Sequence, residues 1–219
     1  MDYGYLRLVL PELLDGLKIT VQASIFGMII AVVLGMLLAS VQVLRVPVAS
    51  QFATSWIFLI RNTPLLAQLF FLFYVLPRYG ILLDALTLGT IGLGVHFACY
   101  TAEAFRGGFL SVSKGQWEAT QVLHLSTFVT LRSVILPQAI RPVLPALGNN
   151  LLSMFKDSSV LAAITVLELV GVSRKLASTS FQYTTLFTFM GLTYLALAYP
   201  ASLGLRAIER RLAAKEGRE

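Results

Sequence analysis

The sequence predicts an all-α integral membrane protein with about five transmembrane helices. Three observations lead to this class: an apolar composition, long runs without charge, and basic residues gathered in two segments. Of the 219 residues, 57% are hydrophobic and 13% are charged, and the mean hydropathy is +0.77. Soluble domains carry about 25% charged residues, so this chain cannot cover itself with a surface suited to water. The composition therefore excludes an ordinary cytosolic enzyme, a disordered chain and a nucleic-acid-binding domain.

Counts of reactive residues narrow the possible chemistry further. The single cysteine, Cys99, excludes a disulfide framework and a cysteine-based zinc site. With only two histidines besides, we expect neither a metal site nor a catalytic centre. The net charge of +6 would suit nucleic acid, but in so apolar a chain basic residues mark the cytoplasmic ends of membrane spans. We therefore expect membrane lipid, and no nucleic acid, around this chain.

Five segments are candidates for spans, which need about 20 mainly apolar residues. Residues 19–44 and 176–205 carry no charge and exceed this length, and residues 85–102 form a third uncharged run. Two further spans contain charges, one from about Trp56 to Leu76 and one from about Pro142 to Ile164. Lipid tolerates only helices and closed barrels, so we expect no strands in these segments.

Individual residues inside the spans predict local geometry. We expect Pro64 to kink the second span, and Arg61 near its start to extend toward the membrane interface. Glycines in the first and third spans are expected to allow close helix packing: Gly27, Gly35, Gly89, Gly92 and Gly94.

The basic residues predict the orientation. Two segments hold most of the flanking positive charge, with Arg106, Lys114, Arg132 and Arg141 in the middle and Arg206, Arg210, Arg211, Lys215 and Arg218 in the tail. Both segments are expected on the cytoplasmic side. The start of the chain has no positive bias, so we expect it outside, attached and not cleaved as a signal sequence. An external amino terminus and a cytoplasmic carboxyl terminus require an odd number of spans.

The middle segment, about 106–141, is the least hydrophobic long stretch between spans. Ser113 and Gln116 fit a capping box, which predicts a short helix with Glu118 in its first turn. The segment ends in the apolar, proline-terminated stretch Ile135-Leu136-Pro137. Two interpretations stay open on these grounds: a helix that docks into another protein, or a solvated connecting loop.

This segment resembles the cytoplasmic coupling motif of permease subunits in ABC importers. That motif reads Glu-Ala-Ala, three residues, Gly, nine residues, then Ile-any-Leu-Pro. Here Glu118 and Ala119 open the motif, and Ile135, Leu136 and Pro137 close it with nearly the usual spacing. His124 stands where the family favours glycine, so we do not expect a left-handed turn there.

The resemblance covers most of the chain and points to the polar amino acid branch of these permeases. Six further matches occur in the family's order: Arg61-Asn62-Thr63-Pro64 with Gln68, Tyr100-Thr101-Ala102-Glu103 with Arg106-Gly107-Gly108, Gly115-Gln116, Pro137-Gln138-Ala139, Pro145 with Asn149, and Lys156-Asp157-Ser158-Ser159. One match alone is weak, whereas the ordered series is specific.

The resemblance implies a single permease domain over residues 1–219, in the inner (plasma) membrane of a bacterium. It implies a second permease subunit, identical or homologous, two ATPase subunits that hold ATP and Mg²⁺, and an external solute-binding protein. Cargo would be polar amino acids or related zwitterions such as ectoine. The chain has no Gly-x-x-x-x-Gly-Lys-Ser/Thr motif, so ATP hydrolysis is expected elsewhere and no bound cofactor is expected here. The residues expected at the ATPase contact are Gly115, Gln116, Glu118, Ala119, His124, Leu136 and Pro137.

Candidates for the substrate pathway are the polar residues inside the spans, because intramembrane charges usually pair or line a wet cavity. Lys156 and Asp157 could hold the carboxylate and ammonium of a zwitterion. The full set is Asn149, Lys156, Asp157, Ser158, Gln68, His96, Tyr100 and Glu103. Alternatives stay open: Lys156 and Asp157 neutralise partners within the fold or lie at the outer surface, and Glu103 pairs with Arg106.

Two other classes of function compete with an importer subunit. A self-sufficient secondary carrier or small channel usually needs more spans and internal repeats. A membrane-embedded enzyme needs a set of reacting groups that this chain hardly supplies. Only an importer subunit explains a cytoplasmic helix built to contact an ATPase.

Overall fold

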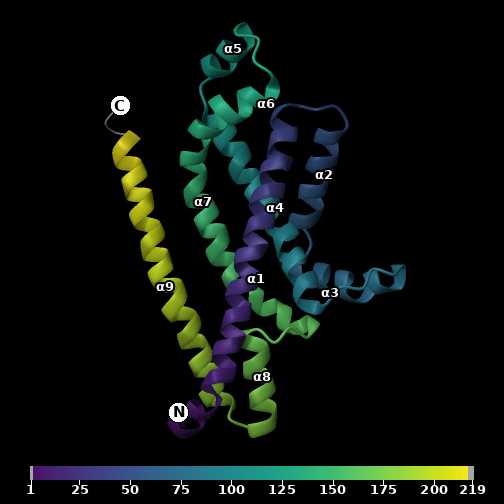
Figure 1. Ribbon diagram of the computed structural model, residues 1–219, viewed down its shortest axis with the longest axis vertical. Coiled ribbons are helices and arrows are strands. Elements are labelled where there is room, and N and C mark those ends of the chain that lie inside the picture. Colours follow the sequence, from purple (N-terminus) through teal and green to yellow (C-terminus); the bar gives the residue numbers. More distant parts are fainter. Residues whose placement is uncertain (1, 217–219) are drawn as a thin grey trace.

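The computed structural model describes residues 2–216, with side chains up to residue 210, and this part of the chain contains helices and no strand. The elements are α1 (Tyr3–Val43), α2 (Ala49–Arg61), α3 (Leu65–Val75), η1 (Leu76–Tyr79), α4 (Ala85–Ser111), α5 (Lys114–Val122), α6 (Thr127–Val129), η2 (Thr130–Ile135), α7 (Leu136–Asp157), η3 (Ser158–Ile164), α8 (Leu169–Ser180) and α9 (Tyr183–Glu216). The molecule is elongated, with α5 and α6 at one end and α8 and the start of α1 at the other (Figure 1).

The centre of the fold is the pair α1 and α4. Small residues let the two helices approach closely. A methyl group on Gly35 would lie 2.8 Å from the carbonyl oxygen of Ala98, and one on Gly94 would lie 2.7 Å from Ile30. The expected close packing at these glycines is therefore confirmed. Asp84 caps α4 by accepting a 2.9 Å bond from the Thr87 amide, and hydrogen bonding to Thr87 lowers the pKa of Asp84.

The predicted spans differ from the helices in their ends. Three helices in the described chain, α1, α4 and α9, are long and apolar enough to cross a membrane, or four spans result if α2 and α3 are counted as one. The segment predicted for residues 142–164 starts earlier, at Leu136, and its α-helix ends at Asp157. The one predicted for 176–205 is split, because α8 ends at Ser180 and α9 begins at Tyr183.

The second predicted span is broken and not merely kinked. Pro64 precedes the first residue of α3 and has extended backbone angles, and the two helices meet at 103° (Figure 1). Proline has no amide hydrogen and clashes with the preceding helical turn, which explains the break at this point. As a result α3 leaves the bundle sideways, close to perpendicular to its long direction.

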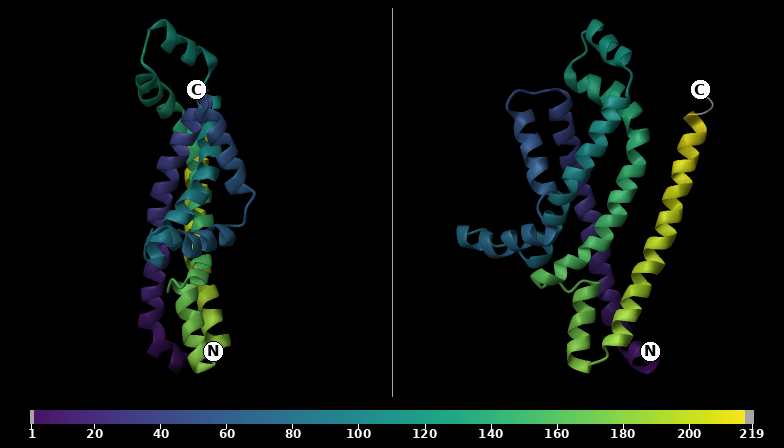
Figure 2. Two further views of the ribbon diagram at one scale, coloured as in Figure 1. Left: turned by 90° about the vertical axis from the view of Figure 1, so that its right-hand side faces the viewer. Right: turned by 180° about the vertical axis from the view of Figure 1, so that it is seen from behind.

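The end of the molecule around α8 is held by a buried core. Leu13 of α1, Leu169 and Leu176 of α8 and Leu186 of α9 pack together there. The opposite end carries α5, α6 and the last turns of α9 (Figure 2). Of the basic tail, Arg206 and Arg210 are described, whereas the side chains of Arg211 and Lys215 and all of Arg218 lie outside the described residues.

Candidate functional site

The short helix predicted in the middle segment is present as α5, and it projects from the end of the bundle (Figures 1 and 2). Trp117 is half-buried and Thr120 is 4% exposed, so this face anchors the helix. Trp117 packs beside Phe105, Phe109 and Ile135. Gly115, Gln116, Glu118 and Ala119 are exposed on the helix. The helix therefore presents the residues of the coupling motif outward.

Large apolar side chains continue this exposed surface. Val122 is 78% exposed, and Leu123 and Phe128 are each 68% exposed. They lie at the end of α5 and in α6, away from the long apolar helices. Large apolar side chains exposed on one short segment fit a surface that binds another protein.

Two details of α5 differ from the sequence prediction. Ser113 precedes the helix, but its side chain caps no amide; its carbonyl oxygen instead accepts a bond from the Gln116 amide, at 3.0 Å. The capping box is therefore absent. Glu118 is the fifth residue of the helix and lies beyond the first turn, so its carboxylate does not cap the amides at the start of the helix.

His124 takes the left-handed conformation that was not expected for it, with φ of 51°. The amide of His124 donates to the carbonyl of Gln121, and that of Leu125 donates to Thr120, both at 3.0 Å. This is the Schellman arrangement that usually carries glycine. The two hydrogen bonds close the helix end, so histidine takes here a conformation in which glycine is the usual residue.

Between α5 and α7 the chain passes through α6 and a π-helical turn, Thr130–Ile135, which contains the first residue of the motif's last part, Ile135. Such turns are rare and are often found at functional sites. Leu136 is half-buried and Pro137 is exposed at the first turns of α7. A 3.4 Å hydrogen bond from the side-chain nitrogen of Gln138 to the side-chain oxygen of Gln116 connects α7 with α5.

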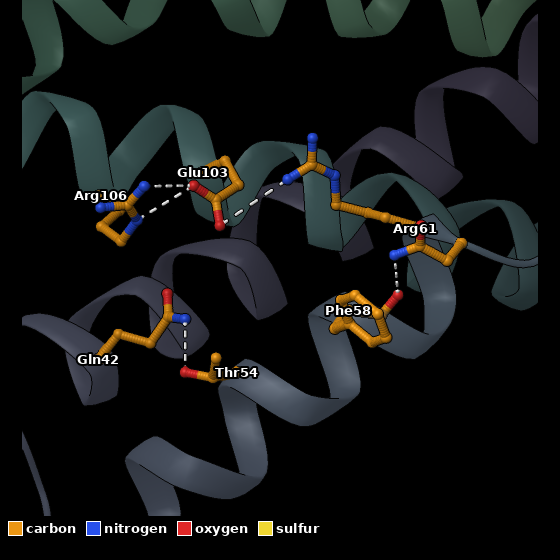
Figure 3. A network of polar contacts seen from close by, with 7 residues as sticks. Gln42, Thr54, Phe58, Arg61, Glu103 and Arg106 are labelled. Atoms are coloured by element: carbon orange, nitrogen blue, oxygen red, sulfur yellow. Dashed lines mark hydrogen bonds and ion pairs between the residues drawn. The ribbon is translucent and has the colours of Figure 1, made fainter.

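A polar cavity of about 420 Å³ lies between α1, α2 and α4. Tyr100 and Glu103, both predicted pathway residues, line it together with Arg61. Figure 3 shows Glu103 between two arginines, with Arg106 at 2.7 Å and Arg61 at 3.9 Å. The pairing of Glu103 with Arg106 is confirmed. The guanidinium of Arg61 lies 5.2 Å from the centre of the Tyr100 ring.

Gln68 and His96 form a separate group at the break between α2 and α3. The ring nitrogen Nδ1 of His96 lies 3.0 Å from Oε1 of Gln68. The amide nitrogen of Gln68 donates to the carbonyl oxygens of Ile60 and Thr63, at 2.8 and 3.1 Å. His96 is 8% exposed. Gln68 and His96 therefore bond each other and the backbone of the chain itself.

The remaining candidates spread along α7. Lys156 is exposed and lines a cavity with Ser159, and α7 extends through Asp157, which is half-buried. Neither Lys156 nor Asp157 belongs to an ion pair in the described chain. Ser158 is buried and donates to the Phe155 carbonyl, and exposed Asn149 donates to Pro145. The structure thus divides the predicted pathway residues and does not gather them in one site.

The sequence prediction did not include Gln42 and Asn62, which line the cavity of Tyr100 and Glu103. The side-chain oxygen of Gln42 is buried without a hydrogen-bond partner in the described chain, while its nitrogen donates to Thr54 (Figure 3). A polar amide near the end of the long apolar run 19–44 was the available signal for Gln42.

The profile of the family described as "binding-protein-dependent transport system inner membrane component" matches residues 31–214. The chain belongs to this family. A probable amino-acid ABC transporter permease protein, y4tG of Sinorhizobium fredii, is 42% identical over 93% of this chain and 88% of its own length. The glutamine transport system permease protein GlnP of Escherichia coli is 32% identical over 96% of this chain and 97% of its own.

Solved structures agree with this membership. An amino acid ABC transporter crystallised with histidines superposes with a TM-score of 0.86 at 30% identity, covering 96% of this chain and 99% of that one. The MetNI methionine transporter superposes with a TM-score of 0.70 at 16% identity, which shows the shared fold. The all-α permease fold is confirmed, and the chain is a permease subunit of a binding-protein-dependent ABC importer rather than an enzyme.

Proposed function

We propose that this permease forms half of the transmembrane pathway of an ATP-driven importer of polar amino acids or related small zwitterions. Most of the similar permeases are named for amino acids, and others for octopine and nopaline, which carry amino and carboxylate groups. Ectoine remains within this class. The chain would act as one domain over residues 1–219, beside an identical or homologous second permease.

The observation that carries the proposal is the exposed surface of α5. Glu118 and Ala119 face outward beside the exposed apolar side chains of Val122 and Leu123. An ATPase subunit that holds ATP and Mg²⁺ would receive this surface in a groove. The hydrogen bond from Gln138 to Gln116 supports transmission of its movement into α7. The shape of the contact would depend on Gly115, His124, Leu136 and Pro137.

Orientation follows from the same assignment. With α5 on the cytoplasmic side, the start of α1 and α8 lie on the outer side, where a solute-binding protein would deliver cargo (Figure 1). The carboxyl terminus would be cytoplasmic, as its basic residues favour. We place the protein in the bacterial inner membrane.

For the pathway we propose two regions, a polar cavity beside α2 and α4 and a mainly apolar cavity that Lys156 and Arg174 make positive. Tyr100 and Glu103 line the cavity that Arg61 shares, and Lys156 lines the cavity near α8. Asp157 would contribute its carboxylate at the end of α7, beside Ser158, with Asn149 two turns before it. Gln68 and His96 would act by holding the α2–α3 break that shapes the first cavity.

Reconstitution tests this function against a self-sufficient carrier or channel. The permease, co-expressed with its ATPase and purified into proteoliposomes, should take up amino acids only with ATP and a loaded binding protein. Uptake driven by an ion or solute gradient without ATP would instead establish the carrier. Failure of the permease to copurify with an ATPase would contradict the assignment of α5.

A further inference from the structure

Two cavities meet at one arginine of α8. A cavity of about 460 Å³ lies at the end of the molecule that carries α8, and a second of about 550 Å³ lies between α3, η3, α8 and α9. Arg174 and Ala162 line both of them. The second cavity also contains Lys156, one of the proposed pathway residues. Arg174 therefore stands where the outer cavity adjoins the cavity of Lys156.

The charges along these cavities have one sign. Lys175 lines the first cavity with Arg174, and Lys156 lines the second, while none of the described acidic side chains lines either. None of the three cations belongs to an ion pair in the described chain. Ser159 adds a hydroxyl group to the second cavity, whereas the Ser178 hydroxyl in the first donates to the Lys175 carbonyl at 2.8 Å. An anion is the ligand that this arrangement attracts.

The helix that carries Arg174 is fixed by a buried carboxylate. Glu168, 0% exposed, accepts hydrogen bonds from the amides of Val170 and Gly171 at 3.0 and 2.8 Å. It also accepts 3.3 Å bonds from Thr20 of α1 and Tyr194 of α9. These bonds hold the first turn of α8 against two long helices. Arg174 lies in the next turn of α8, so these bonds fix the position of its backbone.

We propose that Arg174 binds the carboxylate of the transported solute between the outer cavity and Lys156. This assignment rests on the proposed function, because it takes Lys156 as part of the pathway. A guanidinium forms paired hydrogen bonds with a carboxylate, and an anion held there lies next to a second cation further in. An acidic side chain of the binding protein could occupy the outer cavity alone. The extension of the positive lining to Lys156 favours a small solute.

Thiol reactivity tests the shared position of Arg174 without any substrate. The complete permease–ATPase complex, with Cys99→Ala, receives Ser178→Cys in the outer cavity or Ser159→Cys in the second. Each thiol is reacted with anionic methanethiosulfonate ethylsulfonate and with its cationic trimethylammonium counterpart. Arg174→Gln should lower the anionic-to-cationic rate ratio at both positions, by about threefold or more for a unit charge within ~7 Å.

Matched variants sharpen this result. Lys175→Gln should lower the ratio at Ser178→Cys more than at Ser159→Cys, because Lys175 lines only the outer cavity. Arg7→Gln, an exposed cation that lines neither cavity, should leave both ratios unchanged. An unchanged ratio at either cysteine in Arg174→Gln would overturn the proposal.

Transport then identifies the anion. With saturating loaded binding protein, Arg174→Gln should lower uptake of a radiolabelled amino acid about tenfold, and Arg174→Lys should recover part of it. A loss of binding-protein affinity for the complex, with uptake at saturation unchanged, would make the cavity a docking surface and overturn the proposal. If the parent complex takes up none of the common amino acids, the proposed function fails. The thiol reaction rates still show in that case whether Arg174 attracts anions to both cavities.

Discussion

His96 in α4 and Gln68 in α3 are joined by a 3.0 Å hydrogen bond between Nδ1 and Oε1. This bond connects a straight central helix with the broken pair α2 and α3. The last carbonyl groups of a helix have no partner within it. Here the Gln68 amide nitrogen donates to one of them, that of Ile60 in the last turn of α2, and to the carbonyl oxygen of Thr63 in the break itself. The amide nitrogen of Gln68 therefore bonds carbonyl groups at the break, and its amide oxygen connects the break to α4.

Replacing Gln68 with Leu should destabilise the permease by about 1–3 kcal/mol, because the Thr63 carbonyl and the His96 ring lose the side chain that bonds them. The Ile60 carbonyl keeps its bonds from Thr63. Thermal unfolding of the purified protein measures this as a lower midpoint. Gln51→Leu, at an exposed position of α2, is the control and should change the midpoint little. Equal midpoints for the two variants would show that Gln68 does not hold the break.

A second prediction concerns the contact of α1 with α4. Gly35→Ala should cost about 1–3 kcal/mol, because the added methyl would lie 2.8 Å from the Ala98 carbonyl and force the helices apart. Gly191→Ala in α9 is a matched control, since nothing in the described chain lies within 4 Å of the added methyl. It should raise stability by up to about 1 kcal/mol. The two substitutions should thus shift the unfolding midpoint in opposite directions.

The turn after α5 gives a third prediction. His124→Gly should stabilise this turn by about 0.5–1 kcal/mol, because glycine adopts positive φ without the strain of a side chain. His124→Val should destabilise it, because a branched β-carbon is poorly tolerated there. Hydrogen exchange of the amides of His124 and Leu125 should slow in the first variant and accelerate in the second. Faster exchange in His124→Gly would contradict the proposed cause.

The fourth prediction concerns the exposed carboxylate of α5. Glu118→Lys should uncouple uptake from ATP, or prevent copurification with the ATPase, with uptake reduced by about tenfold or more, because a charged hydrogen bond is replaced by a like-charge contact. Glu118→Gln keeps the size and a hydrogen-bonding oxygen and should retain more uptake. If Glu118→Lys assembles and transports like the parent, Glu118 is not at the contact.

Much of the fold could be predicted from short stretches of the sequence. The uncharged runs predicted the long helices, and the glycines predicted the close packing of α1 with α4. The residues that follow Ser113 predicted the short helix α5. The ends of the helices were less accurate. Pro64 breaks its span where a kink was expected, and the resulting break is held by Gln68, which bonds the carbonyl oxygens of Ile60 and Thr63. His124 was misjudged for a similar reason, since hydrogen bonds at the helix end outweigh the preference of one residue.

The sequence by itself determined the class of molecule, because solubility in lipid is a property of composition and run length. It also supplied the coupling motif, whose residues are local in the chain and form one short helix. Only the tertiary structure decided which polar residues share a cavity. Tyr100, Glu103 and Arg61 line one cavity from two helices, whereas Lys156 of α7 and Arg174 of α8 line another. Such groupings depend on how helices cross and where they break, and spacing along one chain does not contain that information.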